Sequence, residues 1–268
     1  MQELTLKRLK EVEVDLLKKI DEFCKENNIR YFLHAGSLLG SIRHKGFIPW
    51  DDDIDISMPR EDYDRFIVLM KESRGDFSFI CNEYDPNYAY AFGKISDNHT
   101  ELIETNRKYN KTGVYIDVFP LDTLPNDEKK AFKFVKKCHY YTWMYFMATD
   151  VKYRKAKTKK VGFFKHFAYP ISKLFGYRYW IKKLKKLSIK YKNETSEYVA
   201  NVYSPNYIHV FKKEWFKESV ELPFENIMAQ APCGYKELLE KMYGDYMKLP
   251  PVEKQVTHHD FVGYELDC

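Results

Sequence analysis

The segment "DDDIDISM", residues 51–58, alternates acidic with apolar side chains. Alternate side chains of a β-strand point to the same face, so the carboxylates of Asp51, Asp53 and Asp55 are predicted to lie on one face. Asp52 then points to the opposite face, together with the two isoleucines. A strand with one acidic and one apolar face needs an apolar core on its second side. The segment therefore predicts a sheet that helices cover on its apolar face.

The remaining apolar spacing supplies such helices and further strands. Apolar residues recur at helical intervals in several segments, and short apolar runs typical of strands lie between them. The predicted helices cover residues 5–27, 37–46, 60–73, 126–149 and 234–244, and the predicted strands cover residues 29–36, 53–58, 77–83, 90–96, 100–106 and 113–121. We therefore expect an α+β fold with a mixed sheet flanked by helices. The expected parts are a catalytic core in residues 1–125, a helical insertion in residues 126–195, and a C-terminal part, residues 196–268, that completes the core and the substrate pocket.

The clustered carboxylates suggest a cation site. Like charges at neighbouring positions repel each other and raise one another's pKa, so the cluster costs stability unless a cation lies between them. Hard oxygen ligands suit Mg²⁺ or Mn²⁺, which also bind substrate phosphates. A two-metal site usually takes a third acid from a neighbouring strand, and Asp117 in "VYIDVFPLD" has the same apolar-acid-apolar pattern. The alternative is a solvated acidic turn without function, and Asp122 is best interpreted as a helix-entry or loop residue.

A Gly-Ser pair, Gly36 and Ser37, lies where the first predicted strand meets the next predicted helix. At such a junction, free backbone N–H groups, a hydroxyl group and the positive end of the helix dipole all favour phosphate oxygens. A Gly-Ser turn by itself is weak evidence. Followed by Asp-x-Asp on one strand and a third Asp on a later strand, it predicts a phosphate-binding site beside the carboxylates.

This constellation resembles the nucleotidyltransferase fold of the DNA polymerase β superfamily. The stretch "GSLLGSIRHKGFIPWDDDIDISMPREDYDRF" is similar in more detail to the signature of the LicD family, and "KISDNHT", "IDVFPLD" and "YGDYMKLPP" also resemble LicD sequences. The similarity is strong over residues 29–122, moderate over residues 220–259 and thin between them. LicD-like proteins are in turn similar to fukutin-related transferases.

The resemblance implies a metal-dependent phosphotransferase. Such an enzyme moves a phospho-alcohol group, typically phosphocholine, from a CDP-alcohol donor such as CDP-choline to a hydroxyl group of a lipid-linked glycan, for example a lipopolysaccharide or teichoic acid precursor. CMP is then the leaving group. The resemblance also implies that Asp53 and Asp55 bind Mg²⁺ or Mn²⁺ with support from Asp51. Asp117 is then either a further metal ligand or the base that accepts the hydroxyl proton.

The resemblance also suggests which side chains contact the donor. Arg43, Lys45 and Lys94 are candidates for binding the diphosphate, although each is equally well explained as a surface cation. Trp50 either forms a wall of the pocket or packs the loop. A choline group would need a cage of aromatic side chains, and the 22 Tyr, 19 Phe and 4 Trp are too many for the sequence to select among. The alternatives are transfer of ribitol phosphate or phosphoethanolamine, a CTP-dependent nucleotidyltransferase, and a non-catalytic membrane-associated binding protein.

The segment from Val151 to Lys192 contains fifteen of the 44 Lys and Arg residues and none of the 39 Asp and Glu residues, with aromatic residues between the cations. Cations are attracted to anionic lipids and aromatic rings lie well at headgroup depth, so this segment predicts contact with an anionic membrane, on its inner face. An ordinary solvated helical hairpin is the alternative. No nucleic-acid-binding motif accompanies the charge, and a nucleic-acid partner is not expected.

Further features favour a cytoplasmic protein. No window approaches the uninterrupted apolar length of a membrane span, and the first residues form a charged amphipathic pattern rather than a signal peptide. The five cysteines are an odd number without a CxxC pair, so reduced thiols are expected. His258 and His259, like His44 and His139, are interpreted as surface or packing residues.

Overall fold

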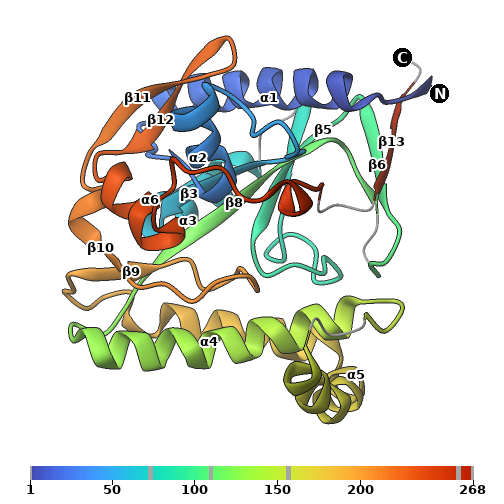
Figure 1. The fold of residues 1–268 in the computed structure, drawn as a ribbon, viewed down its shortest axis with the longest axis vertical. Coiled ribbons are helices and arrows are strands. Elements are labelled where there is room, and N and C mark those ends of the chain that lie inside the picture. Colours follow the sequence, from blue (N-terminus) through green and yellow to red (C-terminus); the bar gives the residue numbers. More distant parts are fainter. Residues whose placement is uncertain (1, 72–74, 109–110, 155–157, 258–260, 267–268) are drawn as a thin grey trace.

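The computed structural model describes residues 2–71, 75–108, 111–154, 158–257 and 261–266, and this part of the chain has an α+β fold (Figure 1). The helices are α1 (Leu6–Glu26), α2 (Ala35–His44), α3 (Arg60–Met70), α4 (Glu128–Thr149), α5 (Lys159–Ser188) and α6 (Tyr235–Tyr243). The strands are β1 (Gln2–Glu3), β2 (Phe32–Leu33), β3 (Ile54–Pro59), β4 (Phe77–Ile80), β5 (Gly93–Asp97), β6 (Thr100–Glu104), β7 (Lys111–Thr112), β8 (Tyr115–Thr123), β9 (Tyr198–Ala200), β10 (Phe211–Lys212), β11 (Ser219–Phe224), β12 (Ile227–Pro232) and β13 (Phe261–Glu265). Short 3-10 helices are η1 (Ile189–Tyr191), η2 (Lys213–Phe216) and η3 (Val252–Lys254).

A mixed central sheet positions the acidic residues. Its strand order is β10-β9-β8-β3-β2, and β5 joins it by pairing with β8 on one side and with β4 on the other. β3 and β8 are parallel, whereas β2, β5 and β9 run antiparallel to the strands they pair with. The predicted mixed sheet flanked by helices is confirmed. A smaller sheet, β1-β13-β6-β7, brings the two ends of the chain together.

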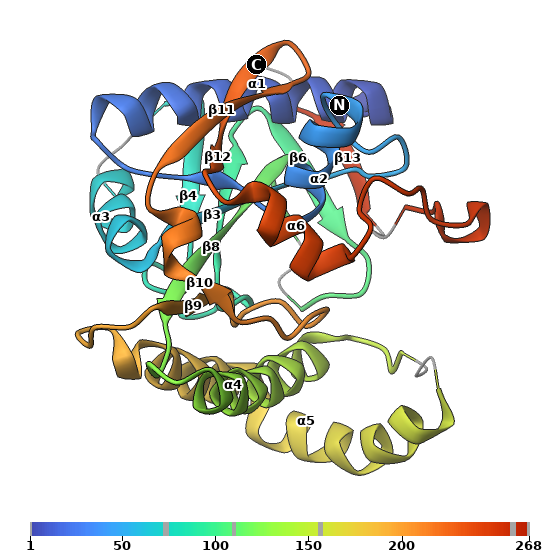
Figure 2. The same ribbon diagram turned by 60° about the vertical axis from the view of Figure 1, so that its left-hand side comes forward.

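The helices cover the central sheet from opposite sides. In both views, α1 lies on one side of the molecule, and α4 and α5 form a layer on the other, next to β9 and β10 (Figures 1 and 2). The apolar face of α1, with Leu16, Leu17 and Ile20, belongs to the same buried cluster as Ile54 and Ile56 of β3. The two isoleucines therefore anchor the strand in the core, as its alternation predicts.

The helix α4 agrees with the helix predicted over residues 126–149, and its N-cap is Asp127, whose side chain accepts a hydrogen bond from the Lys130 N–H group. The following helix α5 is interrupted at Gly176, whose φ of 72° is not helical. After this break, Trp180, Ile181 and Leu184 are buried in the same cluster as the inner face of α4. The second half of α5 is therefore held by the core.

The junction before β3 differs from the prediction. The strand expected over residues 29–36 is limited to Phe32–Leu33, because α2 already begins at Ala35. This helix ends at His44, and its C-cap is Lys45, which has a φ of 63°, whereas the prediction extends the helix to Gly46. Gly46 has another role, since a Cβ atom there would lie 2.1 Å from the Glu225 Oε1 atom.

Within the described residues, no helix has both the length and the apolar character that crossing a bilayer requires. The cysteines of this part of the chain are free thiols, namely Cys24, Cys81, Cys138 and Cys233. Cys268, His258 and His259 lie outside the described residues.

Candidate active site

Three charged side chains form a row across the central sheet. Lys94 on β5 is opposite Asp117 on β8, and Asp117 is opposite Asp55 on β3. Directly paired residues of neighbouring strands point to the same face, so these three side chains are neighbours. The Lys94 Nζ atom is 2.6 Å from the Asp117 Oδ1 atom. The prediction that Asp117 belongs to a strand next to that of Asp55 is confirmed.

Lys94 is a buried cation. Its side chain is 2% exposed, and its Nζ atom lies 3.2 Å from the ring centroid of Tyr115 and 4.9 Å from that of Tyr90. A buried ammonium group is tolerated where a carboxylate and aromatic ring faces surround it. The interpretation of Lys94 as a surface cation is therefore wrong. Its contact with the donor diphosphate stays a prediction, and its observed partner is Asp117.

The carboxyl group of Asp55 is in an unfavourable environment for a negative charge. Burial raises its pKa well above the usual value, and the charge of Asp53 raises it further. Asp117 and Asp51 act in the same direction, whereas Lys94 opposes them. Such a position costs folding free energy, which is typical of side chains kept for chemistry rather than for stability.

The preceding aspartates lie in a loop and not on the strand. β3 begins at Ile54, and Asp51, Asp52 and Asp53 can each offer a carboxylate oxygen within 4.8 Å of the other two. The prediction that Asp52 points away with the isoleucines is wrong, because strand alternation applies only from Ile54 onward. The loop instead gathers three carboxylates at the start of β3.

A fourth acid that the sequence analysis missed, Glu13 of α1, lies near this loop. It is 2% exposed, and its Oε2 atom has no hydrogen-bond partner among the described residues. Burial raises its pKa well above the usual value, and Asp53 and Asp52 add to the shift. The sequence did contain a signal, since Glu13 lies four residues after Leu9 and four before Leu17 on the apolar face of the helix.

The Gly-Ser pair lies in the first turn of α2, as predicted. His34, at the N-terminal cap of this helix, makes no capping hydrogen bond with its side chain. A Cβ atom at Gly36 would lie 2.6 Å from the Asp51 Oδ2 atom, so a larger residue there would displace this carboxylate from its present position. The Ser37 hydroxyl group accepts a hydrogen bond of 2.8 Å from the backbone N–H group of Asp55. Ser37 therefore ties the helix to β3, and its contact with phosphate stays a prediction.

The other predicted donor contacts lie near the C-terminal end of α2. Arg43 donates hydrogen bonds to the His44 ring and to the carbonyl oxygen of Tyr246, so it is half-buried and positioned by the C-terminal segment. Lys45 is exposed. Trp50 is partly buried and packs against the main core cluster, which favours the packing role.

Two tyrosines that the sequence did not single out lie close enough to Asp55 for their titration to depend on its charge. The pKa of Tyr207 is raised by burial and then by Asp55, and its hydroxyl oxygen is 2.7 Å from the His34 Nε2 atom. The pKa of Tyr243 is raised by burial and then by Asp55, Asp51 and Asp53. Burial also lowers the pKa of His34 to about 4, so this imidazole is neutral at physiological pH. The C-terminal segment thus contributes polar aromatic groups to the site.

Asp122 lies on β8 and not in a loop or at a helix entry, so that interpretation is wrong. It is 1% exposed, and its Oδ1 atom is 2.7 Å from the Arg60 Nε atom. The Tyr203 hydroxyl group donates to its other oxygen at 2.8 Å. Asp122 is the centre of a buried ion pair, apart from the row of Lys94, Asp117 and Asp55.

The donor set of the site suits a hard divalent cation. Four aspartates that repel one another surround the start of β3, three of them with oxygens close enough to share an ion. Carboxylate oxygens are the preferred ligands of Mg²⁺ and Mn²⁺. The positive end of α2 and the buried Lys94 lie next to these acids. The arrangement can therefore bind a cation and a phosphate group side by side.

Comparison with known proteins links this geometry to one family. The family described as LicD/FKTN/FKRP, nucleotidyltransferase domain, matches residues 28–174. The lipopolysaccharide cholinephosphotransferase LicD of Haemophilus influenzae is 34% identical over 276 aligned residues, which cover 99% of this chain and all of that protein. An uncharacterised protein of Rickettsia prowazekii is 49% identical over 110 residues, which are 41% of this chain and 39% of the relative. The human ribitol 5-phosphate transferase FKRP is 53% identical over 34 residues, which are 13% of this chain and 7% of FKRP.

Proposed function

The chain belongs to the LicD family, and we propose that it transfers phosphocholine from a CDP-activated donor to a hydroxyl group of a cell-surface glycan, with release of CMP. The observation that carries this proposal is the similarity to the Haemophilus cholinephosphotransferase along the whole of both chains. We further assign the α+β core to the nucleotidyltransferase type. The family description and the placement of Asp55 opposite Asp117 both support this assignment.

In the proposed reaction, an oxygen–phosphorus bond forms between the acceptor hydroxyl group and the distal phosphorus of the donor. The bond from that phosphorus to the CMP oxygen breaks, and the hydroxyl proton goes to Asp117. The Lys94 Nζ atom, 2.6 Å from the Asp117 Oδ1 atom, would hold this carboxylate in position. Asp53 and Asp55, with support from Asp51, would hold Mg²⁺ or Mn²⁺. When bound, the ion would offset the charge that develops on the leaving group.

The first turn of α2 would bind the donor phosphates through the backbone N–H groups of Gly36 and Ser37. Arg43 lies in the last turn of α2, where its contact with the carbonyl oxygen of Tyr246 holds it, and it would contact a part of the donor that extends along the helix. Catalysis of this type depends mainly on positioning, so these groups would act by placing the distal phosphorus in line with the attacking hydroxyl group.

Transfer of ribitol phosphate is a second candidate, because a stretch of 34 aligned residues is 53% identical between FKRP and this chain. The short match covers too little of FKRP to outweigh the full-length relative. Phosphoethanolamine transfer, synthesis of a CDP-alcohol from CTP, and a binding function without turnover stand further behind. The retained aspartates speak against the last of these, since they are costly unless they bind a cation.

A panel of CDP-choline, CDP-ribitol and CDP-ethanolamine distinguishes these candidates. We expect CMP release from CDP-choline to exceed release from the other two by at least about tenfold, since ribitol has no cationic group for cation–π contacts and the ammonium group of ethanolamine has N–H donors that aromatic ring faces leave without a conventional acceptor. Excess EDTA should abolish the reaction, and Mg²⁺ or Mn²⁺ should restore it. Pyrophosphate release from CTP would instead show a nucleotidyltransferase. Full transfer in EDTA without bound metal would contradict the metal-dependent mechanism.

We also propose that α5 holds the enzyme against the inner face of an anionic membrane. The exposed apolar side chains of α5 include Val161, Phe163, Phe164, Phe167, Ile171, Leu174, Phe175 and Tyr179. Exposed patches of this kind mark interaction sites, and aromatic side chains are favoured at the depth of lipid headgroups. Lys182, Lys183 and Lys186 are exposed on the same helix and would attract anionic lipids.

Vesicle flotation tests the membrane proposal. Anionic vesicles should carry the protein, and replacing Phe163, Phe164 and Phe167 by Ser should reduce the bound fraction at least about tenfold, because each ring buries apolar area. A variant with Phe132→Ser and Tyr140→Ser, two comparably exposed rings of α4, is the control and should float normally. Equal binding to neutral and anionic vesicles, or binding to neither, would overturn the proposal.

A further inference from the structure

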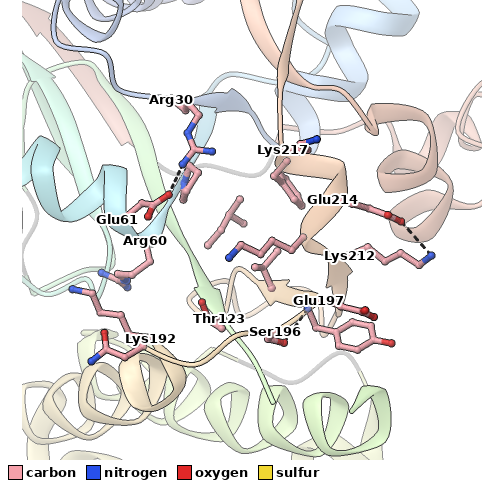
Figure 3. Close-up of a pocket in the computed structure, with 17 residues that line it drawn as sticks. Arg30, Arg60, Glu61, Thr123, Lys192, Ser196, Glu197, Lys212, Glu214 and Lys217 are labelled. Carbon is pink, nitrogen blue, oxygen red and sulfur yellow. Dashed lines mark hydrogen bonds and ion pairs between the residues drawn. The ribbon is translucent and has the colours of Figure 1, made fainter. Parts of the chain in front are cut away.

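Figure 3 shows a cavity of about 670 Å³, and the residues that line it do not include Lys94, Asp117 or Asp55. Its wall includes Pro59 and Thr123, the last residues of the parallel strands β3 and β8. These positions lie four residues after Asp55 and six after Asp117, which is about 13 to 20 Å along the strands. The cavity is thus at the opposite ends of the strands that carry the catalytic aspartates. Its volume is in the usual range for sites that bind small molecules.

The polar wall of the cavity is mainly basic. Six cationic side chains line it against three acidic ones, Glu61, Glu197 and Glu214, and the cations are Arg30, Arg60, Lys192, Lys212, Lys213 and Lys217. They come from segments far apart in the sequence, including the start of α3 and the turn η2. The close-up shows labelled cations on several sides of the cavity, so the fold gathers positive charge there.

Several of these cations are held in position by acids. Arg30 binds Glu61 at 2.5 Å, and Lys192 binds Asp64 at 2.5 Å. Arg60 is buried, and its guanidinium group donates to Asp122, Asp64 and Tyr203, so it is fixed at the edge of the cavity.

Two cations of the wall, Lys213 in η2 and Lys217 directly after it, have no acidic partner in the described part of the chain. Lys213 and Lys217 are exposed, and neither forms an ion pair with another described residue. Their neighbour Lys212 already binds Glu214 at 3.3 Å. Two cations that line one cavity without ion-pair partners repel each other, and a bound anion would relieve this repulsion.

The cavity also has an apolar floor. Leu121, Val199 and Phe216 are buried side chains of the wall, and Tyr198 adds an aromatic ring. An inorganic anion would leave this surface without contact, whereas a ligand with both a charged group and an apolar body would use both parts of the wall.

We propose that this cavity is a second binding site, which takes an organic phosphate of about nucleotide size. The phosphate binds between Lys213, Lys217 and the held cations Arg30 and Lys192, and the apolar body of the ligand packs on Leu121, Val199 and Phe216. The ligand is either a soluble phosphate ester or the headgroup of a phospholipid, which share this chemistry. The proposal does not depend on the function proposed above, because the cavity and the aspartates lie at different ends of the strands.

Isothermal titration of the full chain in EDTA tests the site, since removal of divalent cations leaves the aspartates repulsive to phosphate. The probes are CMP, for the soluble source, and dihexanoyl phosphatidic acid below its micellar concentration, for the headgroup. The variant combines Lys213→Glu with Lys217→Glu, and the control combines Lys129→Glu with Lys133→Glu on the exposed face of α4. Both variants change the net charge equally, so long-range attraction is matched.

We expect at least one probe to bind, with an affinity that falls at least about tenfold in the η2 variant because two direct phosphate contacts become repulsive. The α4 control should stay within about twofold. The probe that binds more tightly identifies the source of the ligand. A milder variant with Gln at both η2 positions keeps the test valid if charge reversal disturbs folding. Equal affinity of wild type and both η2 variants, or no binding of either probe at millimolar concentration, would overturn the proposal.

Discussion

Asp55→Asn is expected to lower turnover at least about a hundredfold while the protein stays folded, on the scale of a lost charge contact in a preorganised site. Asp55 lies between the loop carboxylates and Asp117, and its charge is disfavoured by burial and by Asp53. Replacing the carboxylate by an amide of the same shape removes this repulsion. The free energy of unfolding should therefore stay the same or increase.

Steady-state CMP release and urea unfolding, measured on the same preparations, test this expectation. Asp53→Asn should also lower turnover without lowering the free energy of unfolding, because the same repulsion acts between Asp53 and Asp55. Asp15→Asn is the matched control, since Asp15 is an exposed aspartate of α1 and should leave both quantities unchanged. Near-normal turnover of the Asp55 variant, or a variant that fails to fold, would show that this carboxylate is structural.

Asp122→Asn should lower stability and leave catalysis unchanged. We expect the free energy of unfolding to fall by about 3–5 kcal/mol, because the substitution leaves the buried cation Arg60 without its main partner. Asp122 is 1% exposed, and the Arg60 side chain that it binds is 10% exposed. Arg60 keeps a weaker contact of 3.2 Å with Asp64, which places the expected loss toward the lower end. The folded fraction should retain its turnover, since this ion pair does not face Asp55.

Urea denaturation measures this loss, and Asp64→Asn provides the comparison. The Asp64 carboxylate also binds Arg60, but the Asp64 side chain is 35% exposed. Its removal should therefore lower the free energy of unfolding by no more than about 1 kcal/mol. A loss below about 1 kcal/mol for Asp122→Asn, or a loss of turnover at unchanged stability, would contradict the stabilising role of the ion pair between Asp122 and Arg60.

Asp55, Asp117 and Asp122 also show how far an interpretation from sequence reaches. Asp55 is recognisable because it alternates with buried isoleucines on one strand. Asp117 has the same local pattern, so its strand could be recognised as a partner. Asp122 lies on the same strand as Asp117, but its sequence context predicts a loop or helix-entry residue, since nothing near it in the sequence indicates Arg60 as its partner. Local alternation identifies which face of a strand is polar, and it does not identify what lies opposite that face.

The sequence by itself determined the order and type of the principal elements, the acidic start of β3, the third acid on β8 and the Gly-Ser turn in α2. These features follow from side-chain periodicity and from glycine and capping preferences, which act over a few residues. Only the tertiary structure decided that Asp52 joins its neighbours, that Glu13 lies close to them, and that Lys94 is the buried partner of Asp117. Such contacts depend on which distant segments become neighbours, and that is settled by packing of the whole core rather than by any local pattern.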